Sequence, residues 1–170
     1  VNPTVAVAIT DTDLNDTDSV SEVTFTFDEV PFNFDASDIT AVGGLVTGLT
    51  ATADPLVYTA TFTATDGFDG TGSVTVGTAW QDAVANTGVS DNDTVAIDTL
   101  NPTVTVDIVD TALSDTDSSS VVTFTFSEAP VNFDASDITS VGGTITGLAV
   151  TADPLVYTAT FTATDGFDGT

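Results

Sequence analysis

The stretch VYTATFTAT at residues 57–65 alternates two kinds of side chain, as half-buried β-strands do. Its even positions hold Tyr, Ala, Phe and Ala, whereas its odd positions hold Val and Thr. Successive side chains of a strand point to opposite faces, so we expect Tyr58 and Phe62 to share one face. The same nine residues return unchanged at positions 156–164.

That duplication belongs to an internal repeat with an offset of 99 residues and no insertion. NPTV at residues 2–5 returns at 101–104, and DGFDG at 66–70 returns at 165–169. Of the 71 pairs of equivalent residues, 55 are identical. The period indicates one small domain per repeat, since solenoid repeats have periods of about 20–50 residues. We therefore expect a domain at residues 1–99 and a second at 100–170 that stops before its last two strands.

Seven short strands are expected in the first repeat, at residues 4–10, 20–27, 39–42, 46–53, 57–65, 73–80 and 94–98. Turn signals such as Gly-Gly and Asp-Pro separate them, and no helical period interrupts the pattern. This arrangement predicts an all-β fold of tandem immunoglobulin-like antiparallel β-sandwiches. The aromatic residues expected in the core are Phe25, Phe27, Phe62 and Trp80.

Acidic residues are the only charged side chains. The chain has 26 Asp and Glu residues and no Lys, Arg or His, which gives a net charge of −26. So much like charge opposes a compact state, so we expect neutralisation by high salt or by bound divalent cations. Nucleic acid and anionic membranes are poor partners for this surface, because binding their phosphates requires Lys or Arg, so we expect no nucleic-acid partner.

The missing residue types also argue against catalysis. Without Cys there are no disulfides, thiolate nucleophiles or Cys-based zinc sites. Without His or Lys, only carboxylates can act as general acids or bases. A hydrolase that uses carboxylates alone is therefore a minor alternative. The Asp residues fall in turns and repeat with the domain, so no enzyme is expected. No run of about 20 apolar residues predicts membrane insertion.

Alternating strand directions would gather acidic turns at one end of the first domain, where it passes to the second. DTDLNDTDS at residues 11–19, DGFDGTG at 66–72 and the end of the last strand would meet there. Calcium takes about six to eight oxygen ligands in irregular geometry, so these turns predict a Ca²⁺ site at the junction. The candidate metal ligands are Asp11, Asp13, Asp66, Asp69, Asp98, Asn101, Asp110, Asp165 and Asp168. Solvated turn residues on a salt-adapted surface are the alternative, since Asp-Gly is an ordinary turn pair.

A second acidic group is expected at the opposite end of the domain, and only some of its members can be ligands. Its members are Asp28, Glu29, Asp54, Asp82, Asn86, Asp91, Asn92 and Asp93. The motif NFDASDIT predicts turn capping instead of metal binding. Its Asp residues are Asp35, Asp38, Asp134 and Asp137.

Four motifs follow one another in a fixed order: FTFDEVP at residues 25–31, FDASDITAVGG at 34–44, YTATFT at 58–63 and DAVAN at 82–86. This combination resembles the bacterial Ig-like tandem repeats of giant cell-surface adhesins and biofilm-associated proteins, over essentially the whole chain. The resemblance implies secreted, calcium-rigidified stalks of many tandem domains, exported by Gram-negative bacteria. That family has DAAGN where this chain has DAVAN, so Ala85 replaces a Gly.

The sequence therefore predicts a structural stalk or filament segment of a secreted bacterial surface adhesin or extracellular fibre, rigidified by Ca²⁺ at the junctions between repeats. A glycan- or protein-binding adhesive module is the alternative, although the aromatic residues fall mostly at inward positions. The expected partners are neighbouring repeats of the same long chain, with other fibre chains or surface glycans as further candidates. Because the chain begins at Val1 and its second repeat breaks off, we expect a segment of a longer protein.

Overall fold

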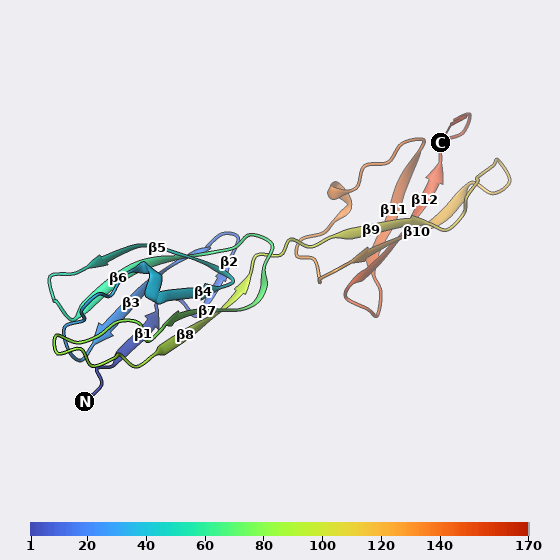
Figure 1. Ribbon diagram of the computed structural model, residues 1–170. Coiled ribbons are helices and arrows are strands. Elements are labelled where there is room, and N and C mark those ends of the chain that lie inside the picture. Colours follow the sequence, from blue (N-terminus) through green and yellow to red (C-terminus); the bar gives the residue numbers. More distant parts are fainter. Residues whose placement is uncertain (170) are drawn as a thin grey trace. The chain divides into compact units, whose positions relative to one another are not determined.

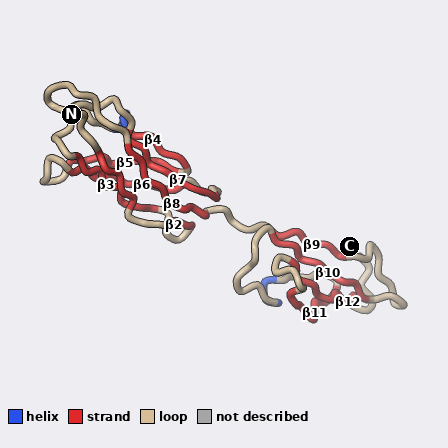
Figure 2. Tube along the Cα trace, turned by 90° about the horizontal axis from the view of Figure 1, so that it is seen from below, coloured by secondary structure: helices blue, strands red, loops and turns tan. Residues whose placement is uncertain are grey.

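The computed structural model describes residues 1–169, which form two compact units (Figure 1). Unit 1 is Val1–Asn101, and unit 2 comprises the described residues from Pro102 onward. Helical structure in the described chain is limited to two short 3-10 helices, Ala36–Asp38 and Ala135–Asp137 (Figure 2). Within residues 1–169, no helix has the length and apolar character that a membrane span requires.

Unit 1 is a sandwich of two four-stranded sheets. The first sheet has the order β1 (Val5–Ile9), β3 (Val20–Phe27), β6 (Val57–Ala64), β5 (Gly44–Ala51). The second has the order β2 (Asp13–Asn15), β8 (Asp91–Asp98), β7 (Asp69–Val76), β4 (Ile39–Val42). Both sheets turn one apolar face inward, and the predicted all-β immunoglobulin-like sandwich is confirmed.

The observed strands differ from the predicted ones at several bounds: β5 lies at Gly44–Ala51 rather than at 46–53, and β7 begins at Asp69 rather than at Ser73. Three further differences concern the acidic loop, Trp80 and the last strand. The acidic loop at residues 11–19 contains β2, which runs parallel to β8, because burial of Leu14 draws this segment onto the second sheet. The sixth strand ends at Val76, so Trp80 lies in the connection that follows it. The last strand begins at Asp91 rather than at Thr94.

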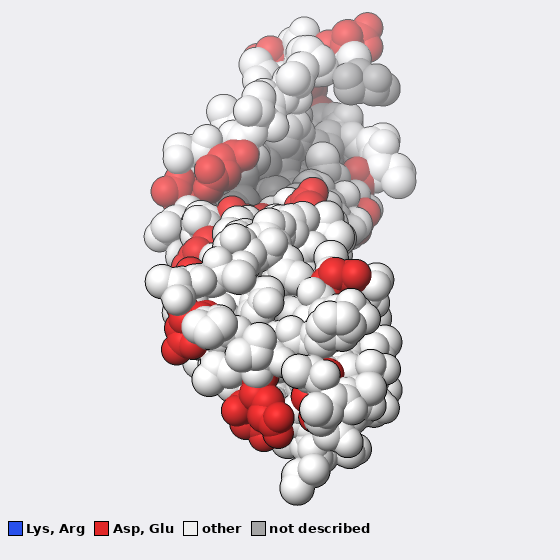
Figure 3. Space-filling model, turned by 60° about the vertical axis from the view of Figure 1, so that its left-hand side comes forward, with Lys and Arg blue, Asp and Glu red and all other residues white. Residues whose placement is uncertain are grey.

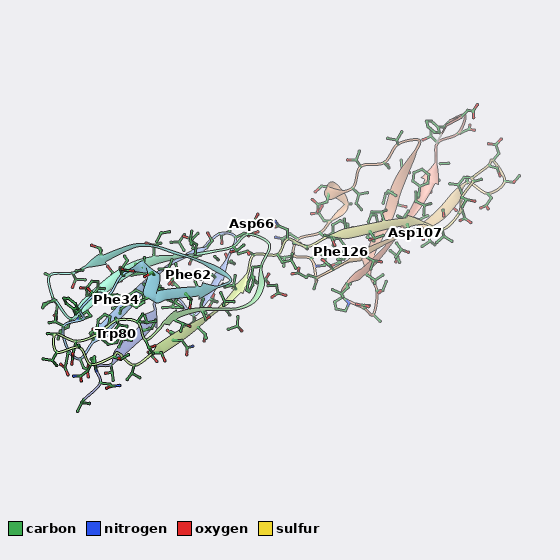
Figure 4. The ribbon with its side chains drawn as sticks, viewed as in Figure 1. Phe34, Phe62, Asp66, Trp80, Asp107 and Phe126 are labelled. Carbon is green, nitrogen blue, oxygen red and sulfur yellow. The ribbon has the colours of Figure 1, made fainter. Side chains whose placement is uncertain are left out.

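The core lies between the two sheets and is rich in aromatic rings. All four predicted core residues are buried, and Figure 4 shows Phe34, Phe62 and Trp80 inside unit 1. The Phe27 ring meets Trp80 edge-on with centroids 4.8 Å apart, and it meets Phe34 at 4.9 Å. Edge-to-face contacts of this kind add about 0.5–1.5 kcal/mol each to the burial of the rings.

The connection from β7 to β8 closes one end of this core. The Trp80 Nε1–H donates to the carbonyl of Gly77 at 3.1 Å, and Gly88 packs so closely against the indole that no Cβ fits there. Ala85 has a φ of +66°, in the left-handed region that strains a residue with a side chain. The turn therefore keeps a backbone suited to glycine although an alanine occupies the position.

Unit 2, over its described residues, is one antiparallel sheet. Its order is β11 (Gly143–Val150), β12 (Val156–Ala163), β10 (Ser119–Phe126), β9 (Val104–Ile108). The pairing of Val122 with Ile108 repeats that of Val23 with Ile9 in unit 1. Its apolar face lines an open groove of about 630 Å³. Val106 is 55% exposed whereas its equivalent Val7 is 8% exposed, because the second sheet covers this face in unit 1.

Gly88→Ala is expected to lower the free energy of unfolding of unit 1 by about 1–3 kcal/mol, because the added methyl group must displace the Trp80 ring. Calorimetric unfolding of the chain measures the loss. Gly77→Ala is the matched control, since a Cβ there meets only the Asp38 carbonyl at an ordinary 3.6 Å. Equal losses in the two variants would show that the close packing on Trp80 is not the cause.

Ala85→Gly is expected to stabilise unit 1 by about 0.5–1 kcal/mol. Relief of left-handed strain contributes about 1–2 kcal/mol, and the greater entropy of glycine in the unfolded chain offsets part of it. Urea unfolding followed by circular dichroism tests the sign. Ala83→Gly, in the same turn but without a positive φ, should destabilise by a similar amount. A destabilised Ala85→Gly variant would contradict the strain argument.

Candidate functional site

On the face shown in Figure 3, acidic side chains form separate patches with neutral surface between them. Because the sequence has no Lys, Arg or His, these carboxylates cannot pair with a basic side chain. Their protein partners are main-chain N–H groups, hydroxyls and amides, as the hydrogen bonds below show. The carboxylates therefore fall into two groups: those that already accept such hydrogen bonds, and those that do not.

Three polar residues stand in a row at the exit end of unit 1, the end at which β8 stops. Asp69 of β7 pairs with Asp98 of β8, and Asp98 pairs with Asn15 of β2. Directly paired residues project to the same face with Cβ atoms about 4.5–5.5 Å apart. Asp13 pairs with Ala96, which lies two residues before Asp98 in β8. Asp13 therefore lies on the same exposed face of the sheet. The structure therefore places the predicted ligands Asp69 and Asp98 side by side, with Asp13 on the same face of the sheet.

Thr99 fixes the turn that carries Asp66 to the end of β8. Its hydroxyl donates to the Thr65 carbonyl at 2.7 Å, and its N–H donates to the Phe68 carbonyl at 2.8 Å. The Gly67 N–H donates in return to the Thr99 carbonyl at 3.0 Å. This network holds Asp66 at the exit end (Figure 4). The sequence does not indicate this role of Thr99, since one Thr in a Thr-rich chain carries no signal.

Asp11 and its equivalent Asp110 are positioned differently from the other predicted ligands. The Asp11 N–H donates to the hydroxyl of Ser21 at 3.0 Å, and the Asp110 N–H donates to that of Ser120 at 2.9 Å. These bonds attach Asp11 to β3 and Asp110 to β10, whereas the row that contains Asp69 lies on the second sheet of unit 1. Asp11 is therefore anchored through the first sheet, separately from the row.

The row by itself does not provide the ligands that a calcium ion requires. Within residues 1–169, no group of three or more acidic side chains is arranged to hold a metal ion. Asp69 and Asp98 offer two carboxylates, but the Asn15 Oδ1 already accepts the N–H of Thr17 at 2.9 Å and its hydroxyl at 2.7 Å. Calcium needs about six to eight oxygens, so water and carbonyl oxygens would have to complete the set. The remaining predicted ligands, Asn101, Asp165 and Asp168, are exposed in the linker and in the turn after β12.

Two carboxylates of β8 bind the edge of β1. The Val7 N–H donates to Asp91 Oδ2 at 2.9 Å, and the Ile9 N–H donates to Asp93 Oδ2 at 2.8 Å. These two Asp residues join the sheets along one side of the sandwich. Both were candidate ligands at the end opposite the exit, and the structure gives them a structural role that sequence analysis missed.

Asp82 and Asp28 also hold main-chain groups. The buried Asp82 accepts the N–H groups of Val84 at 2.9 Å and Asn86 at 2.8 Å, which fixes the turn around Ala85. Burial alone would raise the pKa of Asp82, but hydrogen bonds from Asn86 and Val84 together outweigh it and lower that pKa. Asp28 accepts the Thr4 N–H at 2.7 Å, and this bond lowers its pKa.

The predicted turn capping is confirmed in both units. The Asp35 side chain accepts the Ser37 N–H at 2.7 Å while Asp38 accepts the Asp35 N–H at 2.9 Å, and Asp134 and Asp137 repeat this capping box. Hydrogen bonds from the Ser37 hydroxyl and N–H lower the pKa of Asp35. A carboxylate with a lowered pKa stabilises the fold above its ordinary pKa of about 3.9. That contribution is lost as the pH falls through the folded-state value.

Comparison with known families agrees with this geometry. A family described as bacterial Ig-like domain matches residues 1–97 and again residues 98–170. Domains of that family are often extracellular or surface-exposed, and they are typically structural modules without enzymatic activity. No match to a curated protein was found. Because the two matches together span the chain, this protein consists of tandem repeats that belong to the bacterial Ig-like domain family.

Proposed function

We propose that the chain is a tension-bearing stalk segment of a secreted bacterial surface adhesin or extracellular fibre. The observation that carries this proposal is the parallel arrangement of the first and last segments of unit 1. Near-identical tandem domains support it as well, because a stalk gains length from each copy. An extracellular location follows from the same proposal.

The N-terminal segment of unit 1 lies alongside β8 over most of its length. Thr4 forms a parallel bridge with Val89, whose N–H donates to the Pro3 carbonyl at 2.9 Å. Further along, the Ala96 N–H donates to the Thr12 carbonyl at 3.1 Å, where β2 pairs with β8 in parallel. The chain thus begins beside the start of β8 and leaves unit 1 at the end of β8.

This geometry decides how the unit responds to tension. Parallel neighbours pulled from opposite ends slide along each other, so their hydrogen bonds are loaded together rather than broken one after another. The bonds from Val7 and Ile9 to the carboxylates of Asp91 and Asp93 are loaded in the same way. Hydrogen bonds to charged acceptors are about twice as strong as neutral ones, so these two strengthen the connection.

We propose in addition that Ca²⁺ binds at the exit end, beside Asp69 and Asp98. A bound cation would remove the repulsion between these paired carboxylates and stiffen the turn that Thr99 holds. Since unit 1 offers few ligands there, the expected dissociation constant is about 10⁻⁴–10⁻³ M, as in extracellular calcium modules. Binding in this range fits a medium in which calcium is abundant.

Replacing Asp91 and Asp93 together by Ala is expected to lower both the free energy of unfolding of unit 1 and its unfolding force. Loss of the two charge-assisted bonds to β1 should cost about 2–4 kcal/mol in stability. Single-molecule pulling from the two chain ends measures the force, and calorimetry measures the stability.

The matched control is Asp16→Ala with Asp18→Ala, which removes the same charge from a turn. In the described chain, neither of these carboxylates accepts a main-chain N–H. The control should therefore unfold at the wild-type force or above it. If both double variants unfold at the wild-type force, the bonds between β1 and β8 do not resist tension and the proposed function loses its support.

Saturating Ca²⁺ is expected to raise the stability of the chain by about 2.7 kcal/mol once its free concentration is a hundred times the dissociation constant. Thermal unfolding in Ca²⁺, in the same concentration of Mg²⁺ and in chelator, at fixed ionic strength, separates binding from screening. Asp69→Asn with Asp98→Asn should abolish the Ca²⁺ increment, because the variant removes the paired carboxylates.

Glu29→Gln with Asp54→Asn serves as the control for this experiment. It removes two charges from the other end of unit 1, and Asn retains the acceptor that binds the Leu56 N–H. This control should keep the Ca²⁺ increment. Identical unfolding midpoints in Ca²⁺ and chelator would leave only a solvated acidic surface.

A further inference from the structure

One part of each repeat is almost free of charge. Residues 39–65 contain a single acid, Asp54, and residues 138–164 contain only Asp153, in a chain with 26 acidic residues. These segments include β4, β5 and β6 of unit 1 and β11 and β12 of unit 2. Five of the sixteen differences between the repeats fall at residues 41–51, and none of the five adds or removes an acid. Elsewhere, four of the eleven differences do.

The two edges of the first sheet differ in the hydrogen bonds that their main-chain groups make. At the β1 edge, the N–H groups of Val7 and Ile9 are bound by the carboxylates of Asp91 and Asp93. At the other edge, β5 pairs with β6 alone. Within the described residues, no side chain forms a hydrogen bond to residues 44–51. The outward N–H and carbonyl groups of β5 are therefore free to pair with another strand.

The surroundings of the β5 edge are apolar as well as uncharged. Leu45 is 64% exposed and Val42 is 56% exposed. A small groove of about 250 Å³ runs beside β5, and every residue that lines it is uncharged, Ile39 and Leu49 among them. A strand added at this edge would cover part of this surface in addition to forming main-chain hydrogen bonds.

We propose that the occupant of the β5 edge is the same edge of a second copy of this chain. Two copies that meet through acidic surfaces repel each other, whereas two β5 edges bring together residues 44–51, which carry no charge. Antiparallel pairing of one strand with its own copy gives a two-fold symmetric, self-complementary contact. In unit 2 the uncharged β11 offers a similar edge, except that the Ser140 hydroxyl donates to the Gly143 carbonyl at 2.8 Å.

The pairing is short. The register of β5 shifts between Thr47 and Thr50, where Gly48 has a φ of +68°, so the regular part available to a second copy is Gly44–Thr47. Irregularities of this kind limit how far an edge can extend. Each contact is therefore weak, and a chain with two such edges can form two of them.

Sedimentation equilibrium over a range of protein concentrations, in about 1 M NaCl where the screening length is about 3 Å, tests this proposal. The average mass of the wild-type chain should rise with concentration. Thr47→Asp with Thr146→Asp places a carboxylate on each exposed edge, and the apparent dissociation constant should rise at least about tenfold.

The matched control is Ala8→Asp with Val121→Glu, which adds two acids at exposed positions where the other repeat already has one, Asp107 and Glu22. The control should associate within about twofold of the wild type, since neither position lies on β5 or β11. Circular dichroism verifies that both double variants are folded.

Hydrogen exchange on the wild type provides a measurement that needs no variant. Amides in Gly44–Thr47 should become more protected as the concentration rises. A wild-type chain that is monomeric throughout overturns the proposal. So does an edge variant that associates like the wild type. Protection confined to β9 and β10 also overturns it, because that result would place the contact on the apolar groove of unit 2.

Discussion

The hydrogen bond from a main-chain N–H to a carboxylate is the interaction on which this structure depends. A chain without basic residues cannot form salt bridges, yet its 26 acids must coexist in a compact fold. Asp91 and Asp93 use such bonds to join the two sheets, and Asp82 uses them to shape a buried turn. In each bond a main-chain N–H donates to a carboxylate oxygen. One contact therefore satisfies the hydrogen-bonding needs of both groups.

The comparison between the repeats shows that the position of Asp28 requires an acceptor rather than a charge. Asp28 accepts the Thr4 N–H at 2.7 Å in unit 1. At the equivalent place in unit 2, the Ser127 hydroxyl accepts the Thr103 N–H at 2.8 Å. A neutral oxygen thus preserves the geometry when the acid is lost. Net charge can therefore vary between repeats while the first sheet keeps its register.

Periodicity predicted the strands that bury alternate apolar residues, because burial itself produces the alternation. The bounds of β3 and β4 were predicted residue by residue, and Phe62 and Trp80 lie in the core as expected. The parallel pairing of β2 was not predictable, since Leu14 is a single apolar residue in an acidic loop. The start of β8 was not predicted, because Asp and Asn are depleted in strands. Only the tertiary contact with β1 explains why the strand already begins at Asp91. For the candidate site, the turn pattern placed Asp69 and Asp98 at one end correctly, but it carried no information about Thr99.

Trp80 gives the molecule an optical property that follows from its position. It is the single tryptophan of the chain, it is fully buried, and its indole N–H is bound to a carbonyl of the same unit. Indole fluorescence from Trp80 therefore reports on the core of unit 1. Emission from a dry, rigid pocket is shifted to shorter wavelength, and it moves to longer wavelength when water reaches the ring. The wavelength of this emission thus follows the opening of the unit 1 core without any label.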